Sequence, residues 1–191
     1  NPLAATAQNT QDPLVKIRIL PETGKVTGGE EIWIGTEQSI EPHWHTYWIN
    51  PGDSGLETRI NWSLPDGFEI GDIQWPTPEK IPFGPLLNFG YEDNVVLLQK
   101  LKVPETLPTG AITLTADIEL LVCKEECIPE YGTYTLTLNG PGAENENNTA
   151  YIQNALKTLP TPLDRQFSHT GMDGQFVLTV QELSIFDIDP E

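Results

Sequence analysis

The feature that most constrains this chain is a run of alternating side chains at residues 112–123. The even-numbered positions, from Ile112 to Val122, are all apolar, and the odd-numbered positions are mostly polar. A period of two is typical of a β-strand that buries one face. In that register Cys123, the last residue of the run, belongs to the polar set, and we expect it to face outward.

The second cysteine, Cys127, lies only a few residues further on, and the chain has no others. The alternation resumes after Pro129, at residues 133–138. Two strands therefore flank a tight connection that contains the pair. We expect both thiols to lie at the tip of these strands, close to water.

Strand-like segments fill most of the remaining chain. They are expected at residues 15–19, from residue 32, and at 60–64, 68–75 and 95–103. Clusters of proline, glycine and aspartate separate them and are typical of turns. This spacing predicts an all-β domain built as a sandwich.

The most aromatic segment lies at residues 41–55 and ends in a turn-forming cluster. On a strand, His43, His45 and Tyr47 would share one face, and the opposite face would carry Trp44, Thr46 and Trp48. We expect one of these sets to pack in the core. Hydrogen-bonded histidines among packed aromatic rings are the favoured interpretation. A soft metal site that combines the histidines with the cysteines is the alternative.

Residues 76–91 contain four prolines and two glycines among several large apolar side chains. This composition predicts a long, stiff loop that does not pair as a central strand. Its apolar side chains would form an exposed patch unless they covered something. The segment is therefore either a lid over the thiols or a small core of its own.

The chain is expected to divide into four parts. Residues 1–13 form an N-terminal arm, 14–139 a sandwich domain, 140–149 a linker, and 150–191 a tail. The tail is expected to hold a helix at 150–159, with Thr149 as its N-cap and Pro160 as its stop, and a strand at 174–183. So short a tail does not make an independent β domain, so it either packs on the first domain or begins a second one.

The charge of the chain excludes two classes of partner. It has 28 acidic and 10 basic residues, a net charge of −18. Nucleic acids and anionic membranes are bound through clustered cations, so we expect neither as a partner. No apolar run is long enough to span a membrane.

Two interpretations of the cysteine pair follow from its spacing. As a staple, a disulfide across so short a loop contributes only about 2 kcal/mol, against about 4 to 5 kcal/mol for one that closes a loop of about a hundred residues. An accessible pair at a short connection is well placed to alternate between dithiol and disulfide. Redox or metal chemistry is therefore favoured over stapling, although the spacing alone is a weak motif.

Four segments together resemble the amino-terminal periplasmic domain of the DsbD family of thiol:disulfide interchange proteins, in particular its ScsB-like branch. The resemblance covers roughly residues 14–138, and the four segments together are far more specific than any one of them. They are WHTYW at 44–48, NPGDSG at 50–55, QWPTP at 74–78 and LVCKEECIP at 121–129.

The resemblance implies an immunoglobulin-like β-sandwich in the periplasm, part of an inner-membrane protein. Reducing equivalents would pass from a transmembrane domain to this module and then to thioredoxin-fold partners, the cysteines being Cys123 and Cys127. It implies no cofactor and no metal, and places such proteins in cytochrome c-type biogenesis and copper tolerance. A protective cap loop would correspond loosely to residues 76–91, with Phe83, Phe89 or Tyr91 as its aromatic cap. The other residues expected around the site are His45, Tyr47, Glu125 and Glu126. The best-known members have a wider cysteine spacing, so their partners need not transfer.

Exchange requires a thiolate that attacks the partner's disulfide. Glu125, Glu126 and Glu130 are expected to disfavour that thiolate, and Lys124 opposes them only in part. The reduced pair would then be a slow nucleophile until a partner docks.

Two other functions stay open at this stage. A copper-binding module would use the same cysteines with a histidine, since this is a ligand set suited to Cu(I). A plain interaction sandwich would leave the cysteines without a role.

Overall fold

A computed structural model describes residues 12–143, 146–161, 167–172 and 175–180 of the chain. It divides into two compact units, residues 1–160 and residues 161–191. Each unit is described by itself.

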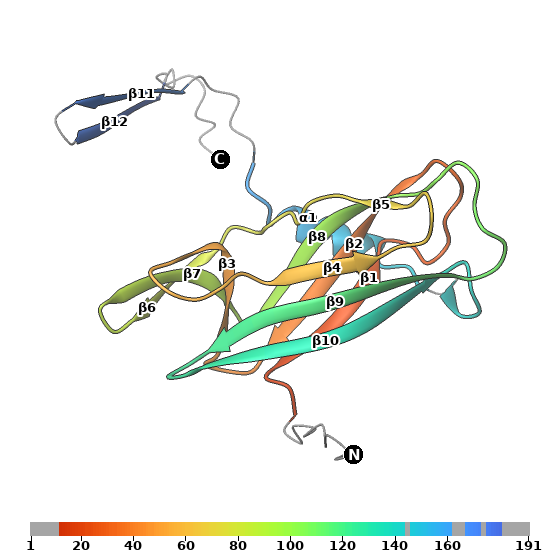
Figure 1. The fold of residues 1–191 in the computed structure, drawn as a ribbon, viewed down its shortest axis with the longest axis horizontal. Coiled ribbons are helices and arrows are strands. Elements are labelled where there is room, and N and C mark those ends of the chain that lie inside the picture. The colour runs from red at the N-terminus through yellow and green to blue at the C-terminus, as the bar shows by residue number, and fades with distance from the viewer. Residues whose placement is uncertain (1–11, 144–145, 162–166, 173–174, 181–191) are drawn as a thin grey trace, which may run out of the picture. The chain divides into compact units, whose positions relative to one another are not determined.

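The first unit is a sandwich of two antiparallel sheets, which confirms the all-β, immunoglobulin-like prediction (Figure 1). The first sheet has the order β1-β2-β8-β5, with bounds β1 Val15–Pro21, β2 Glu31–Ile40, β8 Asn94–Lys102 and β5 Glu69–Ile70. The second has the order β10-β9-β3-β7-β6, with bounds β10 Cys127–Leu138, β9 Ile112–Cys123, β3 His45–Gly52, β7 Leu86–Glu92 and β6 Glu79–Phe83. Strand β4, Arg59–Ser63, pairs with β9 beyond the point where β3 leaves it.

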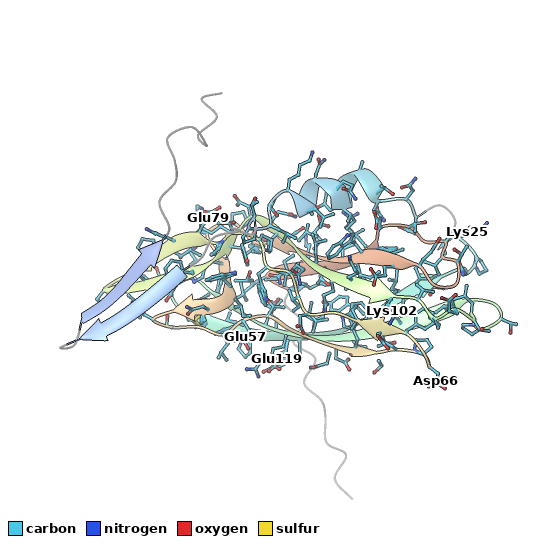
Figure 2. All side chains as sticks on the ribbon, turned by 90° about the horizontal axis from the view of Figure 1, so that it is seen from above. Lys25, Glu57, Asp66, Glu79, Lys102 and Glu119 are labelled. Carbon is cyan, nitrogen blue, oxygen red and sulfur yellow. A yellow bond between two sulfur atoms is a disulfide. The ribbon has the colours of Figure 1, made fainter. Side chains whose placement is uncertain are left out.

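The core lies between the two sheets, where side chains fill the space (Figure 2). The alternation in β9 is confirmed, because its even-numbered residues from Ile112 to Val122 are buried. Charged side chains such as Asp66 and Glu119 lie on the outside. Burial of the apolar face of β9 is what holds the long β9–β10 hairpin in place.

Strand β8 is buried on both faces, unlike β9. Val96 and Leu98 point away from the sandwich core and pack on Ile152 of helix α1, Thr149–Leu156, which is itself fully buried. The sequence of a strand that is covered on both faces is typically a continuous apolar run, and residues 95–98 show this pattern.

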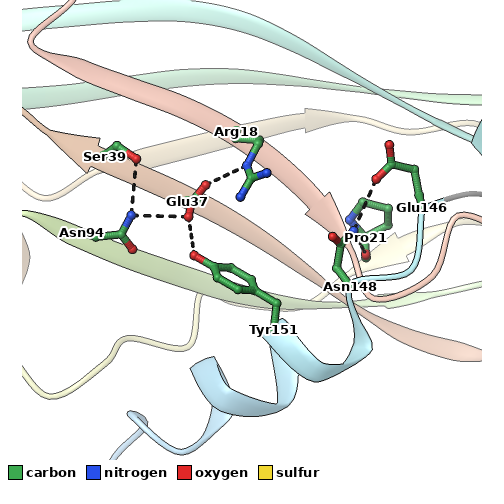
Figure 3. Close-up of polar contacts among 8 residues, drawn as sticks. All are labelled: Arg18, Pro21, Glu37, Ser39, Asn94, Glu146, Asn148 and Tyr151. Atoms are coloured by element: carbon green, nitrogen blue, oxygen red, sulfur yellow. Dashed lines mark hydrogen bonds and ion pairs between the residues drawn. The ribbon is translucent and has the colours of Figure 1, made fainter.

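The predicted helix is confirmed, but it ends at Leu156 and not at residue 159 before Pro160, and its N-cap is Asn148 and not Thr149. The Asn148 side chain does not cap the helix and instead donates from Nδ2 to the carbonyl of Pro21, at 2.9 Å. Figure 3 shows how the helix is held: the Tyr151 hydroxyl donates to the Glu37 carboxylate, which also accepts from Arg18 Nε at 2.7 Å. A carboxylate on β2 thus ties together β1, β2 and α1.

Residues 140–160 belong to the first unit, whereas the sequence placed a linker and a domain boundary at 140–149. The physical reason is that this segment is hydrogen-bonded to the start of the chain. Gly24 N donates to the Glu146 carbonyl at 2.7 Å, and Asn148 N donates to the Glu22 carbonyl at 3.1 Å. The second unit contains the hairpin β11 Phe167–Met172 and β12 Gln175–Val180. The sequence expected only the second of these strands, and residues 174 and 181–183 of that expectation lie outside the described residues.

The prediction of an unpaired loop at residues 76–91 is wrong. Residues 79–92 form the hairpin β6–β7, and β7 lies inside the sheet between β6 and β3. The prolines fit because Pro82 lies in edge strand β6 and Pro85 in the turn. Gly90 fits for the opposite reason: a Cβ there would lie 1.9 Å from the Thr46 carbonyl oxygen, so only glycine allows β7 to approach β3 this closely.

One other expected strand is shorter than its pattern. Of residues 68–75, only Glu69–Ile70 forms a strand, and a single bridge joins Gln74 to Leu98.

Candidate functional site

The two cysteines lie at the tip of the β9–β10 hairpin. Cys123 ends β9, Cys127 begins β10, and the two are direct cross-strand partners joined by a disulfide with an S–S distance of 2.05 Å. Lys124, Glu125 and Glu126 make the turn between them, closed by a hydrogen bond from Lys124 N to the Glu126 carbonyl. This is the hairpin tip that the sequence predicted.

The two sulfurs differ in their access to solvent. Cys127 is exposed, whereas Cys123 is 2% exposed. The expectation that both thiols lie near water is therefore wrong for Cys123. Its register is the outward one, as predicted, but β3 joins β9 at this point, with His45 as the cross-strand partner of Cys123. Residues paired across a sheet share a face, so side chains of β3 cover Cys123 from the outside.

Two side chains of β3 pack beside the disulfide. The Tyr47 hydroxyl lies 3.8 Å from Cys127 Sγ and 3.2 Å from His45 Nε2. The His45 and Tyr47 rings meet edge to face, with 5.1 Å between their centres. Both residues are buried. The structure thus joins sulfur, phenol and imidazole in one chain of contacts.

Burial controls the protonation of both rings. It lowers the pKa of His45 below its ordinary value of 6.5, because the imidazolium ion is poorly solvated there. It also raises the pKa of Tyr47, although a hydrogen bond with Ser54 acts in the opposite direction. At neutral pH both side chains are uncharged and act as hydrogen-bonding groups.

The turn that follows β3 folds over the Tyr47 ring. Gly55, with φ +99°, packs so tightly on it that a Cβ would lie 2.2 Å from a ring carbon. Ser54 donates from both N and Oγ to Asn88 Oδ1 at 3.1 Å, which ties the turn to β7. The sequence predicted this turn but not that it covers the Tyr47 ring. Its turn-forming residues were visible, but no local pattern shows which side chain a turn will contact.

The other expectations for the aromatic segment are met in part. Thr46 is buried and donates to Gln38, while Trp44 and Trp48 pack against the core, so this set is the inward one. His43 does not join His45 and Tyr47. It is exposed in the turn before β3 with φ 71°, because the strand begins only at His45.

The three aromatic residues considered for a cap lie elsewhere. Tyr91 is in the core and donates to the Pro76 carbonyl at 2.8 Å. Phe83 is opposite Leu86 at the tip of the β6–β7 hairpin, and Phe89 is half-buried opposite Lys80. His45, the cross-strand partner of Cys123, pairs with Glu92 at the end of β7 opposite to the hairpin tip. A strand of 7 residues such as β7 spans about 20 Å. The segment therefore forms part of the sheet, and its aromatic tip is remote from the cysteines along β7.

The acidic residues near the cysteines also separate into two groups. Glu125 and Glu126 are exposed in the turn. The Glu130 carboxylate accepts hydrogen bonds from the backbone N of Leu14 and Val15, at 2.7 and 3.1 Å. It points to the opposite face of β10 from Cys127, because the two are an odd number of residues apart. Glu130 thus anchors β1 and is not part of the site.

Two classes of feature are absent from the described part of the chain. In those residues no group of three or more histidine, cysteine or acidic side chains is arranged to hold a metal ion. Among the same residues there is no helix with the length and apolar character needed to cross a membrane.

Comparisons with known proteins show the family and the fold of the chain. The family described as "Thiol:disulfide interchange protein DsbD, N-terminal" matches residues 18–139. The N-terminal periplasmic domain of ScsB from Proteus mirabilis superimposes with a TM-score of 0.63 at 23% identity, over 91% of this chain and 66% of that one. The chain thus spans just under two thirds of that domain, and the likeness shows a shared fold. The reduced N-terminal domain of DsbD from Neisseria meningitidis gives a TM-score of 0.39 at 12% identity, over 64% of this chain and 86% of that one. No curated protein sequence matched the chain.

Proposed function

The chain belongs to the family of DsbD N-terminal domains, and from this premise we propose that it is a periplasmic protein-disulfide reductase module. It receives reducing equivalents from a transmembrane electron-carrying domain of the same full-length protein. It passes them by thiol–disulfide exchange, through Cys123 and Cys127, to thioredoxin-fold partners. The family supports the exchange chemistry, and the periplasmic ScsB domain with the same fold supports the location.

The observation that carries this proposal is the unequal exposure of the two sulfurs in one hairpin. A partner reaches Cys127, which is exposed, and does not reach Cys123, which β3 covers. Exchange through a mixed disulfide needs one accessible sulfur and a second sulfur in contact with it. The hairpin supplies both, because the two cysteines are cross-strand partners.

The proposed cycle is balanced in electrons. In the reduced module the Cys127 thiolate attacks one sulfur of the partner's disulfide, and the partner's other sulfur takes the electron pair. Cys123 then attacks Cys127 Sγ, which closes the Cys123–Cys127 bond and releases the partner as a dithiol. The transmembrane domain restores the dithiol by the same exchange in reverse.

The charges of the turn support a module that is slow to react with the wrong partner. Glu125 and Glu126 directly precede Cys127 in the turn and are expected to disfavour the ionised form of its sulfur, because like charges repel. Lys124 offsets only one of these two charges. We expect the attacking thiolate to form mainly when a partner docks.

The remainder of the chain also has a place in this proposal. Residues 161–191, with the β11–β12 hairpin, are proposed to begin a second sandwich domain. Helix α1, which the sequence assigned to that domain, packs on the first one.

Trapping in the periplasm tests the exchange function. Cys123→Ala leaves the exposed sulfur without its resolving partner, so mixed disulfides with thioredoxin-fold proteins should accumulate. Cys127→Ala leaves only the buried sulfur and should trap little. Non-reducing electrophoresis followed by mass spectrometry of the adducts reads both results. Failure of both variants to trap any thioredoxin-fold protein would remove the proposal, and efficient trapping by Cys127→Ala would reverse the roles of the two sulfurs.

A further inference from the structure

The contacts of Tyr47 point to a role in the reaction and not only in packing. We infer that the Tyr47 hydroxyl and the His45 imidazole form a path that takes the proton from the Cys127 thiol as it attacks a partner's disulfide. Tyr47 touches the reacting sulfur and is the catalytic residue, while His45 acts through it as a positioning residue. This inference rests on the exchange function proposed above.

The geometry of the path is continuous. In the disulfide form, Cys127 Sγ lies 3.8 Å from Tyr47 Oη, which lies 3.2 Å from His45 Nε2, within hydrogen-bond reach for a sulfur–oxygen and an oxygen–nitrogen pair. A hydroxyl both donates and accepts, so Tyr47 accepts from the thiol while it donates to the ring nitrogen. An uncharged imidazole that carries its proton on Nδ1 offers Nε2 as an acceptor, which is the tautomer this path requires, and burial favours the uncharged form of His45.

The surroundings hold the hydroxyl at this position. Gly55 packs against the ring from one side, and His45 meets it edge to face. Because the ring is 2% exposed and packed in this way, its hydroxyl stays directed at the sulfur and the imidazole.

The ionisable neighbours of His45 come from each adjacent strand. Its cross-strand partner on β9 is Cys123, its partner on β7 is Glu92, and Tyr47 is two residues along β3. Glu92 is exposed, so water screens its charge. The neighbour in direct hydrogen-bond contact is the Tyr47 hydroxyl.

The proton balance of the step is as follows. As the new bond forms between Cys127 Sγ and the partner sulfur, the thiol proton passes to Tyr47 Oη, and the hydroxyl proton passes to His45 Nε2. The bond between the partner's two sulfurs breaks, and its electron pair stays on the leaving sulfur. The leaving sulfur takes a proton from solvent and His45 releases the one it gained, which leaves Tyr47 and His45 as they began. A thiol attacks only as its thiolate, so a base in contact with the sulfur helps the reaction.

The test uses the reduced 191-residue chain and a small disulfide, 4,4′-dithiodipyridine, whose release product is followed by absorbance between pH 5 and 9. Tyr47→Phe keeps the ring and removes the hydroxyl. Its initial rate at pH 7 should fall about tenfold, and the midpoint of the pH profile should rise by about one unit. Tyr131→Phe is the matched control, since this tyrosine is 69% exposed on β10, and it should react like the unchanged chain.

His45→Gln separates positioning from proton transfer. Glutamine keeps an acceptor near the Tyr47 hydroxyl but does not titrate. The unchanged chain should show an inflection below pH 6.5, where His45 gains its proton, and the variant should lose it while its thermal unfolding stays similar. His43→Gln, in the exposed turn before β3, is the control and should keep the inflection.

Two results would overturn the inference: a folded Tyr47→Phe variant with the unchanged rate and profile, or a His45→Gln variant that retains the inflection. Because the probe is a small disulfide, these results do not depend on any protein partner. A chain whose rate depends on Tyr47 and His45, but that reduces no thioredoxin-fold protein, would support the proton path and remove the proposed function.

Discussion

At the scale of single residues, Gly55 determines where Tyr47 can lie. Its φ of +99° lies in the region that favours glycine, and its Cα sits directly against the phenol ring. Any larger residue would have to move either the ring or the turn that Ser54 ties to Asn88. The contact between the Tyr47 hydroxyl and Cys127 Sγ therefore depends on Gly55, which has no reactive side chain.

Gly55→Ala is expected to lower the free energy of unfolding by about 2 to 4 kcal/mol, since strain of the backbone and overlap with the ring add together. It should also slow the reaction with a small disulfide, because the hydroxyl is displaced. Urea unfolding and the exchange rate measure the two effects. Gly84→Ala is the control: its φ is +57° with no atom within 4 Å of the added Cβ, so it should cost only about 1 kcal/mol. Equal losses in the two variants would contradict the packing argument.

At the scale of elements, Glu37 joins helix α1 to the first sheet. Burial alone would raise the pKa of Glu37, but hydrogen bonds from Arg18, Tyr151 and Asn94 outweigh it and lower the pKa below the ordinary value of 4.5. A carboxyl group whose pKa is lowered by folding stabilises the fold above its unfolded pKa. That contribution is present at neutral pH and is lost as the pH falls below about 4.5.

Glu37→Gln is therefore expected to cost about 1 to 3 kcal/mol at pH 7, because it removes hydrogen bonds to a charged, poorly exposed group. The difference from the unchanged chain should shrink as the pH is lowered through 4.5. Urea unfolding between pH 3 and 8 measures this. The control is Glu31→Gln on the same strand, whose pair with Lys100 is solvent-exposed at 3.5 Å, and which should change stability by less than about 1 kcal/mol. A pH-independent loss in Glu37→Gln would contradict the assignment.

Tyr151 limits the stabilising effect of the same hydrogen-bond network at alkaline pH. Burial, together with the hydrogen bond to Glu37, raises the pKa of Tyr151 to about 12. Folding thus favours the protonated phenol, whose contribution is complete below the ordinary pKa of 10 and is lost as the pH rises toward 12. The attachment of α1 is strongest between these acid and alkaline limits.

At the scale of the whole molecule, helix α1 is part of the sandwich unit. Ile152 is fully buried against Val96 and Leu98, which without it would lie open on the outer face of β8. The compact unit accordingly extends to Pro160 and not to residue 139. The smallest stable form of the module should include the helix.

Two truncations test this boundary. A chain that ends at Pro160 should unfold within a few degrees of the full chain and react with a small disulfide at the same rate. A chain that ends at residue 139 loses a fully buried isoleucine and the cover of β8, which should cost about 3 kcal/mol or more. Circular dichroism during heating measures both. If the shorter form were as stable as the longer one, the helix would not belong to the unit.

Much of this molecule follows from local sequence pattern. Period-two alternation predicted β9 with its buried face, the short spacing placed Cys123 and Cys127 at a hairpin tip, and a spacing of four between Ile152 and Leu156 predicted α1. These features depend on residues close together in the chain, so a linear pattern contains them. The β6–β7 hairpin was missed because its prolines and glycines resemble a loop, and only its place at the sheet edge makes them compatible with strands.

The site itself depends on contacts between distant parts of the chain. The Tyr47 hydroxyl meets Cys127 Sγ across 80 residues of sequence, and Cys123 is buried because β3 joins β9 at that one point. Alternation assigns a side chain to a face of its strand but does not say what covers that face. The sequence by itself therefore determined most strands of the sandwich, the helix and the position of the cysteine pair. Only the pairing of β3 with β9 and β7 decided which sulfur is exposed and which side chains touch it, because the cover of a sheet is made by elements remote in the chain.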